Sequence, residues 1–166
     1  MSLVTRKVRV LVRDQFVPYL LGRVSKQIAS AASVLYRQWF RVGINNARVV
    51  ISLSRYPGST AMTLCADTGL HKAVVSRSLR VLHAKKFIRF DDSAARRRKI
   101  SLTAKGDTLS QNLQAVMLER ERLLLRGLSA AEKRRLVKYL QRIMLNIPTA
   151  NAYQPRVSLR ARARAR

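Results

Sequence analysis

The sequence predicts a mainly α-helical fold with one small two-stranded β wing. Apolar residues recur every three to four positions over most of residues 16–147, which is the period of amphipathic helices. Only two short segments, 87–90 and 99–102, have the character of strands. Glycine and proline separate the periodic segments, and the hydrophobic content of 48% is ordinary for a globular core. We therefore expect a folded domain rather than a disordered chain.

The first helix is expected to be long and to run from Phe16 to Val42. Its apolar residues lie three and four positions apart, so that they share one face. Gly43 is expected to end it, and Ile44-Asn45-Asn46 offers a cap for a second helix. The turn residues Pro57-Gly58 should end that second helix.

A short third helix is expected over residues 61–67. Thr60 precedes it, and a threonine hydroxyl at that position can accept a hydrogen bond from the first turn. Gly69 follows where a left-handed residue commonly ends a helix. The residues of this helix expected to face inward are Met62, Leu64 and Cys65.

A fourth helix is predicted over residues 72–86, and a β-hairpin after it. The inner face of the helix is expected to consist of Val75, Leu79 and Leu82. The two strands, 87–90 and 99–102, are joined by the polar segment 91–98, so the hairpin should be exposed and should carry a basic tip.

Two further helices complete the predicted chain. Thr103 should cap a long one, and Ser129 and Glu132 have the spacing of a capping box at the start of the last one, which Pro148 should end. The apolar residues expected inside are Leu109, Leu113, Val116, Met117, Leu123 and Leu124 in the first, and Leu136, Leu140, Ile143 and Ile147 in the second.

The order of these elements predicts a winged helix-turn-helix with long N- and C-terminal dimerisation helices. The third and fourth helices with their tight glycine turn form the helix-turn-helix, and the hairpin forms the wing. The long terminal helices have wider apolar faces than one small core requires, which predicts a homodimer. The expected divisions are a basic N-terminal arm (1–15), a winged-helix domain (16–147) and a flexible basic C-terminal tail (148–166). Within the domain, the DNA-binding part is placed at about 44–103 and the dimerisation helices at about 16–42 and 104–147.

The charge of the chain points to an anionic partner. There are 34 Lys and Arg against 8 Asp and Glu, a formal net charge of +26. Self-repulsion on this scale opposes a compact state unless a polyanion offsets it, and nucleic acid is favoured over an anionic membrane surface. Residues 156–166 contain five arginines and no acid, so they either contact phosphates without sequence preference or form an incidental solubilising tail.

Composition also argues against several classes of protein. The longest stretch without a charged residue, Ile143–Pro155, has 13 residues and contains Pro148. A membrane-spanning helix needs about 20 apolar residues, so no membrane partner is expected. A single cysteine, Cys65, rules out an intramolecular disulfide and a cysteine-based zinc cluster, and we expect no metal and no cofactor. The eight acids are scattered without a nucleophile and base nearby, so no catalytic residues and no enzyme are expected. The expected location is the cytoplasm, in association with the nucleoid.

An ordered set of short motifs runs through residues 57–106. It consists of Pro57-Gly58, Thr60, Leu64 and Ala66, Gly69-Leu70, Val75-Ser76-Arg77, Leu82, Phe87-Ile88, Arg96 to Arg98, and Leu102-Thr103 with Gly106. This set resembles the MarR family of bacterial winged-helix transcription regulators, and the resemblance covers roughly residues 16–147. It implies a homodimer on a double-stranded DNA operator, and a repressor that a small aromatic or anionic effector releases from DNA.

The chain departs from the family pattern at three places. The wing positions that usually carry Asp-Arg-Arg are Ala94, Ala95 and Arg96 here. His71 stands where an acidic residue, serine or threonine commonly caps the recognition helix, and Lys86 stands where a glycine often closes it. Each departure makes this surface more positive.

The candidate DNA contacts lie on the fourth helix, on the wing and at one helix N-terminus. Lys72, Ala73, Ser76, Arg77 and Arg80 share an outer arc of the helix. Arg77 can bind guanine in bidentate fashion, Lys72 and Ser76 can reach bases or phosphates, and Ala73 and Val74 can pack on a thymine methyl group. Arg96, Arg97 and Arg98 suit a narrow minor groove, and the amides that follow Thr60 can hold a phosphate. The alternatives are a solvated helix face, a solvated charge run and capping alone.

Three aromatic residues near the end of the first helix are candidates for an effector site. Tyr36, Trp39 and Phe40 could line an aromatic pocket, although such residues more often serve core or dimer packing. Cys65 is expected to be a structural residue rather than a redox sensor.

Two functions therefore compete: a sequence-specific transcription regulator and a non-specific or architectural nucleic-acid-binding protein. The outer arc of the fourth helix and the wing favour the regulator, because a simple polycation would need neither.

Overall fold

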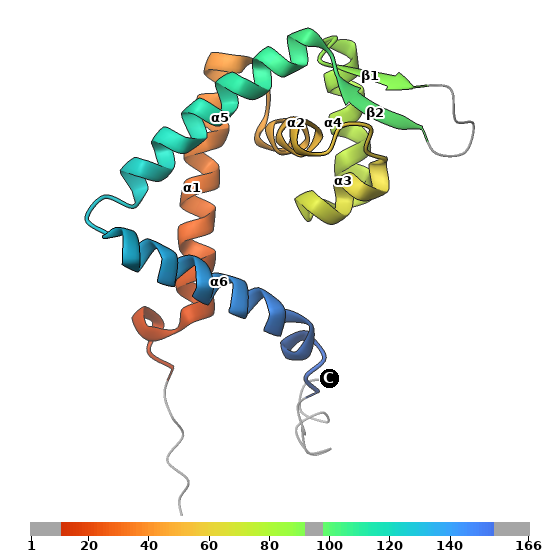
Figure 1. Cartoon of the computed structure of the whole chain (residues 1–166). Helices are drawn as coiled ribbons and strands as arrows, with labels where there is room; N and C mark the ends of the chain where they lie inside the picture. Colours follow the sequence, from red (N-terminus) through yellow and green to blue (C-terminus); the bar gives the residue numbers. More distant parts are fainter. Residues whose placement is uncertain (1–10, 92–97, 155–166) are drawn as a thin grey trace, which may run out of the picture. The chain divides into compact units, whose positions relative to one another are not determined.

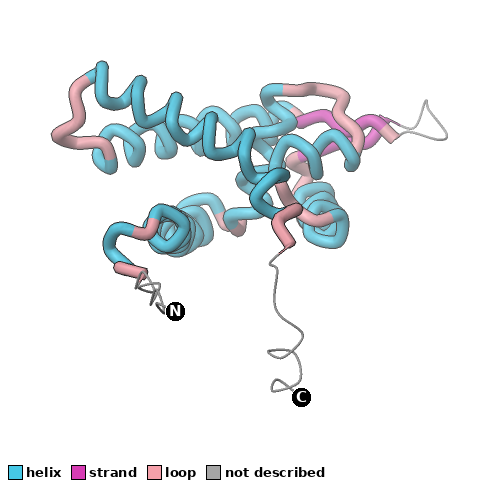
Figure 2. The backbone as a smooth tube through the Cα atoms, turned by 90° about the horizontal axis from the view of Figure 1, so that it is seen from below, coloured by secondary structure: helices cyan, strands magenta, loops and turns pink. Residues whose placement is uncertain are grey.

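The computed structural model describes residues 11–91 and 98–154 (Figure 1). In chain order the elements are a 3-10 helix (Arg13–Gln15), α1 (Val17–Phe40), α2 (Ile44–Arg55), α3 (Ala61–Thr68), α4 (Lys72–Ala84), β1 (Ile88–Asp91), β2 (Lys99–Leu102), α5 (Ala104–Leu124) and α6 (Ala130–Asn151). Helix dominates the described chain, and β1 and β2 pair antiparallel in its one sheet (Figure 2). The mainly α-helical prediction with a two-stranded wing is confirmed. The chain divides into two compact units, residues 1–118 and 119–166.

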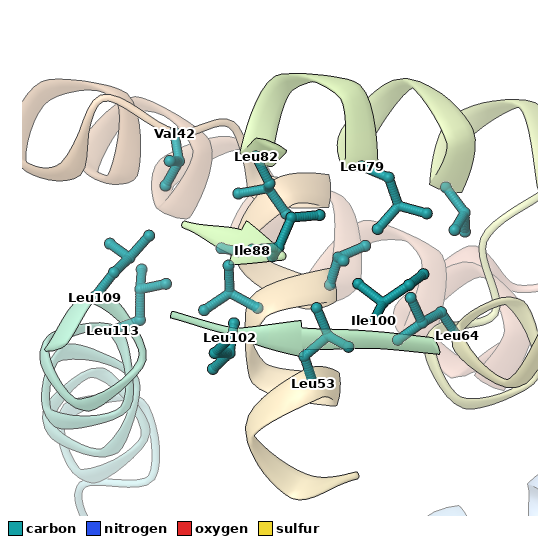
Figure 3. Close-up of a cluster of buried hydrophobic side chains, with 14 of the residues drawn as sticks. Val42, Leu53, Leu64, Leu79, Leu82, Ile88, Ile100, Leu102, Leu109 and Leu113 are labelled. Carbon is teal, nitrogen blue, oxygen red and sulfur yellow. The ribbon is translucent and has the colours of Figure 1, made fainter. Parts of the chain in front are cut away.

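The core of the first unit forms where α2, α3, α4, α5 and the hairpin meet. Leu53, Leu64, Leu82, Ile100 and Leu113 are fully buried and come from five different elements (Figure 3). The three residues predicted on the inner face of α4 are all buried, because their spacing of three and four places them on one side of the helix. The fourth predicted helix therefore has the correct face and ends two residues earlier than expected.

The hairpin is attached to this core on one face only. Ile88 pairs with Leu102 in the antiparallel register, and both side chains are buried, as is Ile100. Alternate residues such as Arg89 and Lys99 are exposed, as the two-residue period of a half-buried strand requires. The backbone N–H of Ile100 also donates to the carbonyl of Ser59 at 2.9 Å, so the segment before α3 adds a single bridge to β2.

A close backbone approach joins the end of α4 to the start of α5. The Thr103 hydroxyl donates to the Lys86 carbonyl at 2.7 Å and accepts from the Gly106 N–H at 3.1 Å, which confirms Thr103 as the cap of α5. A Cβ on Gly106 would lie 2.0 Å from the carbonyl oxygen of Phe87. Only glycine fits this position, which accounts for the Leu-Thr-x-x-Gly motif in physical terms.

Two cationic residues occupy left-handed turns. Lys86, at the position where the family pattern often has a glycine, has φ 60°, and Arg41 has φ 56°. The prediction that α1 extends to Val42 and stops at Gly43 is wrong. The chain turns at Arg41, where the amides of Arg41 and Val42 bond back to the carbonyls of Arg37 and Tyr36, and Val42 is buried beyond the turn. Gly43 instead has extended geometry and precedes the first turn of α2.

Two other predictions about single residues are wrong. Met62 is predicted inside, yet its side chain is 76% exposed, because it is two residues from the buried Leu64 and so lies on the opposite side of α3. Cys65, predicted on the same inner face, is half-buried.

Pro148 does not end the last helix. Helix α6 continues to Asn151, since a proline near a helix end removes only one backbone hydrogen bond. The described part of the predicted tail is therefore helical at its start, and residues 155–166 lie outside the described residues.

The second unit consists of the end of α5, a turn at Gly127 and α6. Ser129 and Glu132 form the predicted capping box, in which each side chain bonds to the backbone N–H of the other residue. None of the residues of α6 is buried within this single copy. The apolar residues expected inside, Leu123, Leu124, Leu136, Leu140, Ile143 and Ile147, are all exposed.

We predict that Gly106→Ala lowers the free energy of unfolding by at least about 2 kcal/mol, because the added methyl group must displace a backbone carbonyl. Gly22→Ala is the matched control: a Cβ added to Gly22 in α1 would meet nothing within 4 Å, so the helix should gain up to about 1 kcal/mol. Denaturant unfolding of both variants measures the difference. Equal stability of the two variants would show that the approach to Phe87 does not constrain the fold.

Candidate nucleic-acid interface

The turn between α3 and α4 is fixed by hydrogen bonds from residues of α3. The Thr60 hydroxyl accepts from the Thr63 N–H at 3.2 Å, which confirms its capping role. At the other end, Gly69 has φ 67° and the Thr68 hydroxyl bonds to the Leu64 carbonyl while accepting from the N–H of Leu70. The two helices are therefore held in a helix-turn-helix by local contacts.

The outer face of α4 is exposed and cationic. Each residue of the predicted arc, Lys72, Ala73, Ser76, Arg77 and Arg80, is exposed, whereas Val74 is half-buried. The helix contains no acidic residue, and His71 at its start makes no capping bond through its side chain. Its cations therefore face solvent without a carboxylate on the same helix to neutralise them.

The base of the wing is anchored to α4 through Phe90. The Phe90 ring centroid lies 4.9 Å from that of His83 on α4, and the Arg98 guanidinium carbon lies 5.0 Å from the same ring. A cation over an aromatic face at this distance is stabilised by the ring quadrupole. Phe90 and His83 thus position Arg98 beside α4. This role was not predicted from the sequence, in which Phe90 stands eight residues before Arg98. Arg96 and Arg97 lie outside the described residues.

Two hollows adjoin α4. The one between α4 and the hairpin has a volume of about 450 Å³, and its polar lining residues are Lys72, Ser76, Arg80, His83 and Arg98. The other, of about 900 Å³, lies beside the N-terminal ends of α3 and α4, and its lining includes Thr60, Thr63, Cys65, His71, Lys72 and Arg98. Among the described residues, neither lining contains a carboxylate. Five of the ten predicted DNA contacts line these hollows, and Arg98 is shared by both. Ala73, Val74 and Arg77 line neither hollow.

The three predicted effector residues are not brought together. Tyr36 is buried, Phe40 is half-buried with its ring 6.3 Å from that of Tyr36, and Trp39 is 73% exposed. Only Tyr36 lines the nearby hollow of about 400 Å³, which is formed by α1, the start of α2 and Met117. Its lining is largely apolar and includes one cation, Arg48, which no sequence pattern singled out.

Two further kinds of site concern metals and membranes. Among residues 11–91 and 98–154, no group of three or more His, Cys, Asp or Glu is placed to hold a metal ion. In the same part of the chain, no helix is long and apolar enough to cross a membrane.

Comparison with known proteins supplies the fold family. No protein-family model matches the chain, and no curated protein matches it in sequence. Solved structures do match: a MarR/EmrR family transcriptional regulator from Acinetobacter sp. ADP1 has 26% identity and a TM-score of 0.77, covering 84% of this chain and 99% of that one. The chain has the MarR-family fold. This confirms the resemblance drawn from the motifs of residues 57–106.

Two other solved structures with a similar fold concern DNA binding and its regulation by a small molecule. The S. aureus MepR–DNA complex has 22% identity and a TM-score of 0.72, covering 82% of this chain and 99% of that one. Bordetella bronchiseptica BpsR, described with the regulation of its DNA binding by 6-hydroxynicotinic acid, has 17% identity and a TM-score of 0.63, covering 75% and 98%. The Acinetobacter protein and MepR are both described as transcription regulators.

We predict that Phe90→Leu accelerates tryptic cleavage of the Arg98–Lys99 bond about two- to fivefold. Loss of the ring removes a contact worth about 0.5–1 kcal/mol at an exposed site. The control is Phe87→Leu, whose ring contacts Lys105 instead of Arg98. Mass spectrometry of timed digests gives the rates, and equal acceleration in both variants would mean that Phe90 does not anchor the wing.

Proposed function

We propose that this protein is a sequence-specific, double-stranded DNA-binding transcription regulator of the MarR type. The observation that carries the proposal is the exposed, acid-free outer face of α4, with Arg98 held beside it by Phe90 and His83. A recognition helix of this kind presents its first turns to base edges in the major groove, and a wing can enter the adjacent minor groove. The MepR–DNA complex, which shares the fold, supports DNA as the partner.

In this proposal the side chains of the interface have different tasks. Arg77 reads guanine, while Lys72, Ser76 and Arg80 contact bases or phosphates. Ala73 is exposed and can meet a thymine methyl group, whereas the half-buried Val74 has less surface to offer. Thr60 shapes the N-terminus of α3, where free amides can hold a phosphate. Arg96, Arg97 and Arg98 are assigned to the minor groove.

We further propose a homodimer in the cytoplasm, bound to the nucleoid. The exposed apolar residues of α6 and the end of α5 would be costly to leave in water, at about 25 cal/mol per Å² of apolar surface. A second copy of the chain would cover them with the same residues, as a two-fold interface requires.

Release from DNA by a small effector is the finer part of the proposal. The hollow beside Tyr36 combines apolar walls with the cation of Arg48, which suits a small aromatic anion. The regulation of BpsR by 6-hydroxynicotinic acid supports a ligand of this class. Of the two modes of regulation, repression is favoured over activation, because binding of such a ligand would then release the protein from its operator DNA.

We predict that Arg77→Ala weakens binding to the preferred duplex by about 1–3 kcal/mol, or about 5- to 150-fold, and weakens binding to random duplex less. The preferred duplex is the one that the wild-type protein selects from a random library, and isotherms are measured at one fixed salt concentration. Arg55→Ala, which removes an exposed charge from α2, is the matched control and should have little effect on the preference. If the library yields no preferred sequence, the non-specific, architectural alternative is favoured.

We predict a solution mass of about twice the 18.9 kDa of the chain, because the apolar faces of the long helices need a partner. Size-exclusion chromatography with light scattering at high salt measures it, since salt suppresses charge-driven association. A monomer throughout the micromolar range would contradict the dimer.

A further inference from the structure

The second unit carries a cationic surface of its own, separate from the winged helix. Arg134, Arg135, Lys138 and Arg142 are exposed on α6. At 3.6 residues per turn they fall within an arc of about 100° and extend over about 12 Å of the helix axis. We call these four residues the α6 stripe.

The carboxylates of the second unit are engaged elsewhere. Glu119 forms a bidentate pair with Arg122, with distances of 2.7 and 2.8 Å, and Glu121 pairs with Lys133 at 3.1 Å. Glu132 accepts from the hydroxyl and N–H of Ser129. The hydrogen bonds of Arg122 lower the pKa of Glu119, and those of Ser129 lower the pKa of Glu132. Within the described second unit, no member of the stripe forms an ion pair.

The charge imbalance continues along the sequence. After Glu132 the chain contains no Asp or Glu, while residues 133–166 hold ten Lys and Arg, five up to Arg142 and five from Arg156. Four like charges on one arc of a helix repel one another, and they have no function in packing because all four are exposed. A polyanion that spans the stripe would relieve this repulsion.

We propose that the α6 stripe is a second, sequence-independent binding surface for the phosphate backbone of double-stranded DNA. The inference rests on the proposed function only in taking DNA as the partner, since the stripe shares no residue with α4 or the wing. Arginine and lysine on a helix can bind phosphates by releasing condensed counterions, without reading bases. An anionic membrane is less suitable, because an interfacial helix must insert its apolar face, which the proposed dimer already covers.

Lysine footprinting of the full-length protein tests the stripe directly. An amine-reactive acetylating reagent is applied with and without a random 40-base-pair duplex, and mass spectrometry measures acetylation of each lysine. Lys138 reports the α6 stripe, Lys72 reports α4, and the exposed Lys26 of α1 is the reference. We expect protection of both Lys138 and Lys72 relative to Lys26.

The outcomes separate the two proposals. Protection of Lys72 without Lys138 overturns the stripe and leaves the winged-helix interface intact, whereas protection of Lys138 alone supports the stripe and contradicts the α4 interface. Vesicles of equal phosphatidylglycerol and phosphatidylcholine form a second arm. Protection of Lys138 by vesicles but not by DNA would assign the stripe to membranes and overturn the proposal.

Salt titrations of variants provide the second test. Replacing all four residues of the stripe by glutamine should reduce the slope of log affinity against log salt by about 3 to 4, which is about 0.9 for each lost contact. The loss should be equal on preferred and random duplex. A charge-preserving variant, Arg134→Lys with Arg135→Lys and Arg142→Lys, should retain the slope. The matched control replaces Arg23, Lys26, Arg37 and Arg55, four exposed cations of α1 and α2, by glutamine. A similar loss of slope in that variant would show that net charge alone causes the effect, and would overturn the site.

Discussion

The placement of the cationic face of α4 and of Arg98 depends on the close approach of the Gly106 backbone to the carbonyl of Phe87. That carbonyl lies between the end of α4 and the start of β1, so its position relative to α5 determines where both elements leave the core. The Thr103 hydroxyl reinforces the approach by bridging the Lys86 carbonyl and the Gly106 N–H. Backbone groups near helix ends need such partners, and here one hydroxyl links the turn after α4 to the first turn of α5.

The position of the hairpin depends on this junction between the turn after α4 and the start of α5. Ile88, Ile100 and Leu102 fill the core beneath α4, which leaves Phe90 beside His83 and Arg98. The position of Arg98 is therefore set by the packing beneath α4. A shift of β1 by one residue would turn Phe90 away from α4 and separate Arg98 from this helix.

Much of this arrangement could be predicted from the sequence because it depends on local rules. The caps Thr60, Thr103 and Ser129, the inner face of α4 and the left-handed Gly69 all follow from residue type and spacing. The errors arose where tertiary contacts decide the outcome. The burial of Val42 draws the end of α1 back to Arg41, and nothing local distinguishes the exposed Met62 from a core residue. The Phe90 anchor joins His83 of α4, Phe90 of β1 and Arg98 just before β2, and a sequence pattern does not reveal such a contact.

Lys86 and Arg41, the two non-glycine residues with left-handed backbone geometry in the described chain, also affect the charge at the ends of α4 and α1. The last carbonyls of a helix carry a partial negative charge of about half an electron, which repels phosphate. A glycine would adopt the left-handed turn with less strain, by about 1–2 kcal/mol, but would leave that charge exposed. Lysine in the turn after α4 and arginine in the turn after α1 add a full positive charge close to these helix ends instead. A cation in the turn that ends a helix offsets the negative end of the helix macrodipole, so each of these two turns carries a charge opposite to that of the helix end beside it.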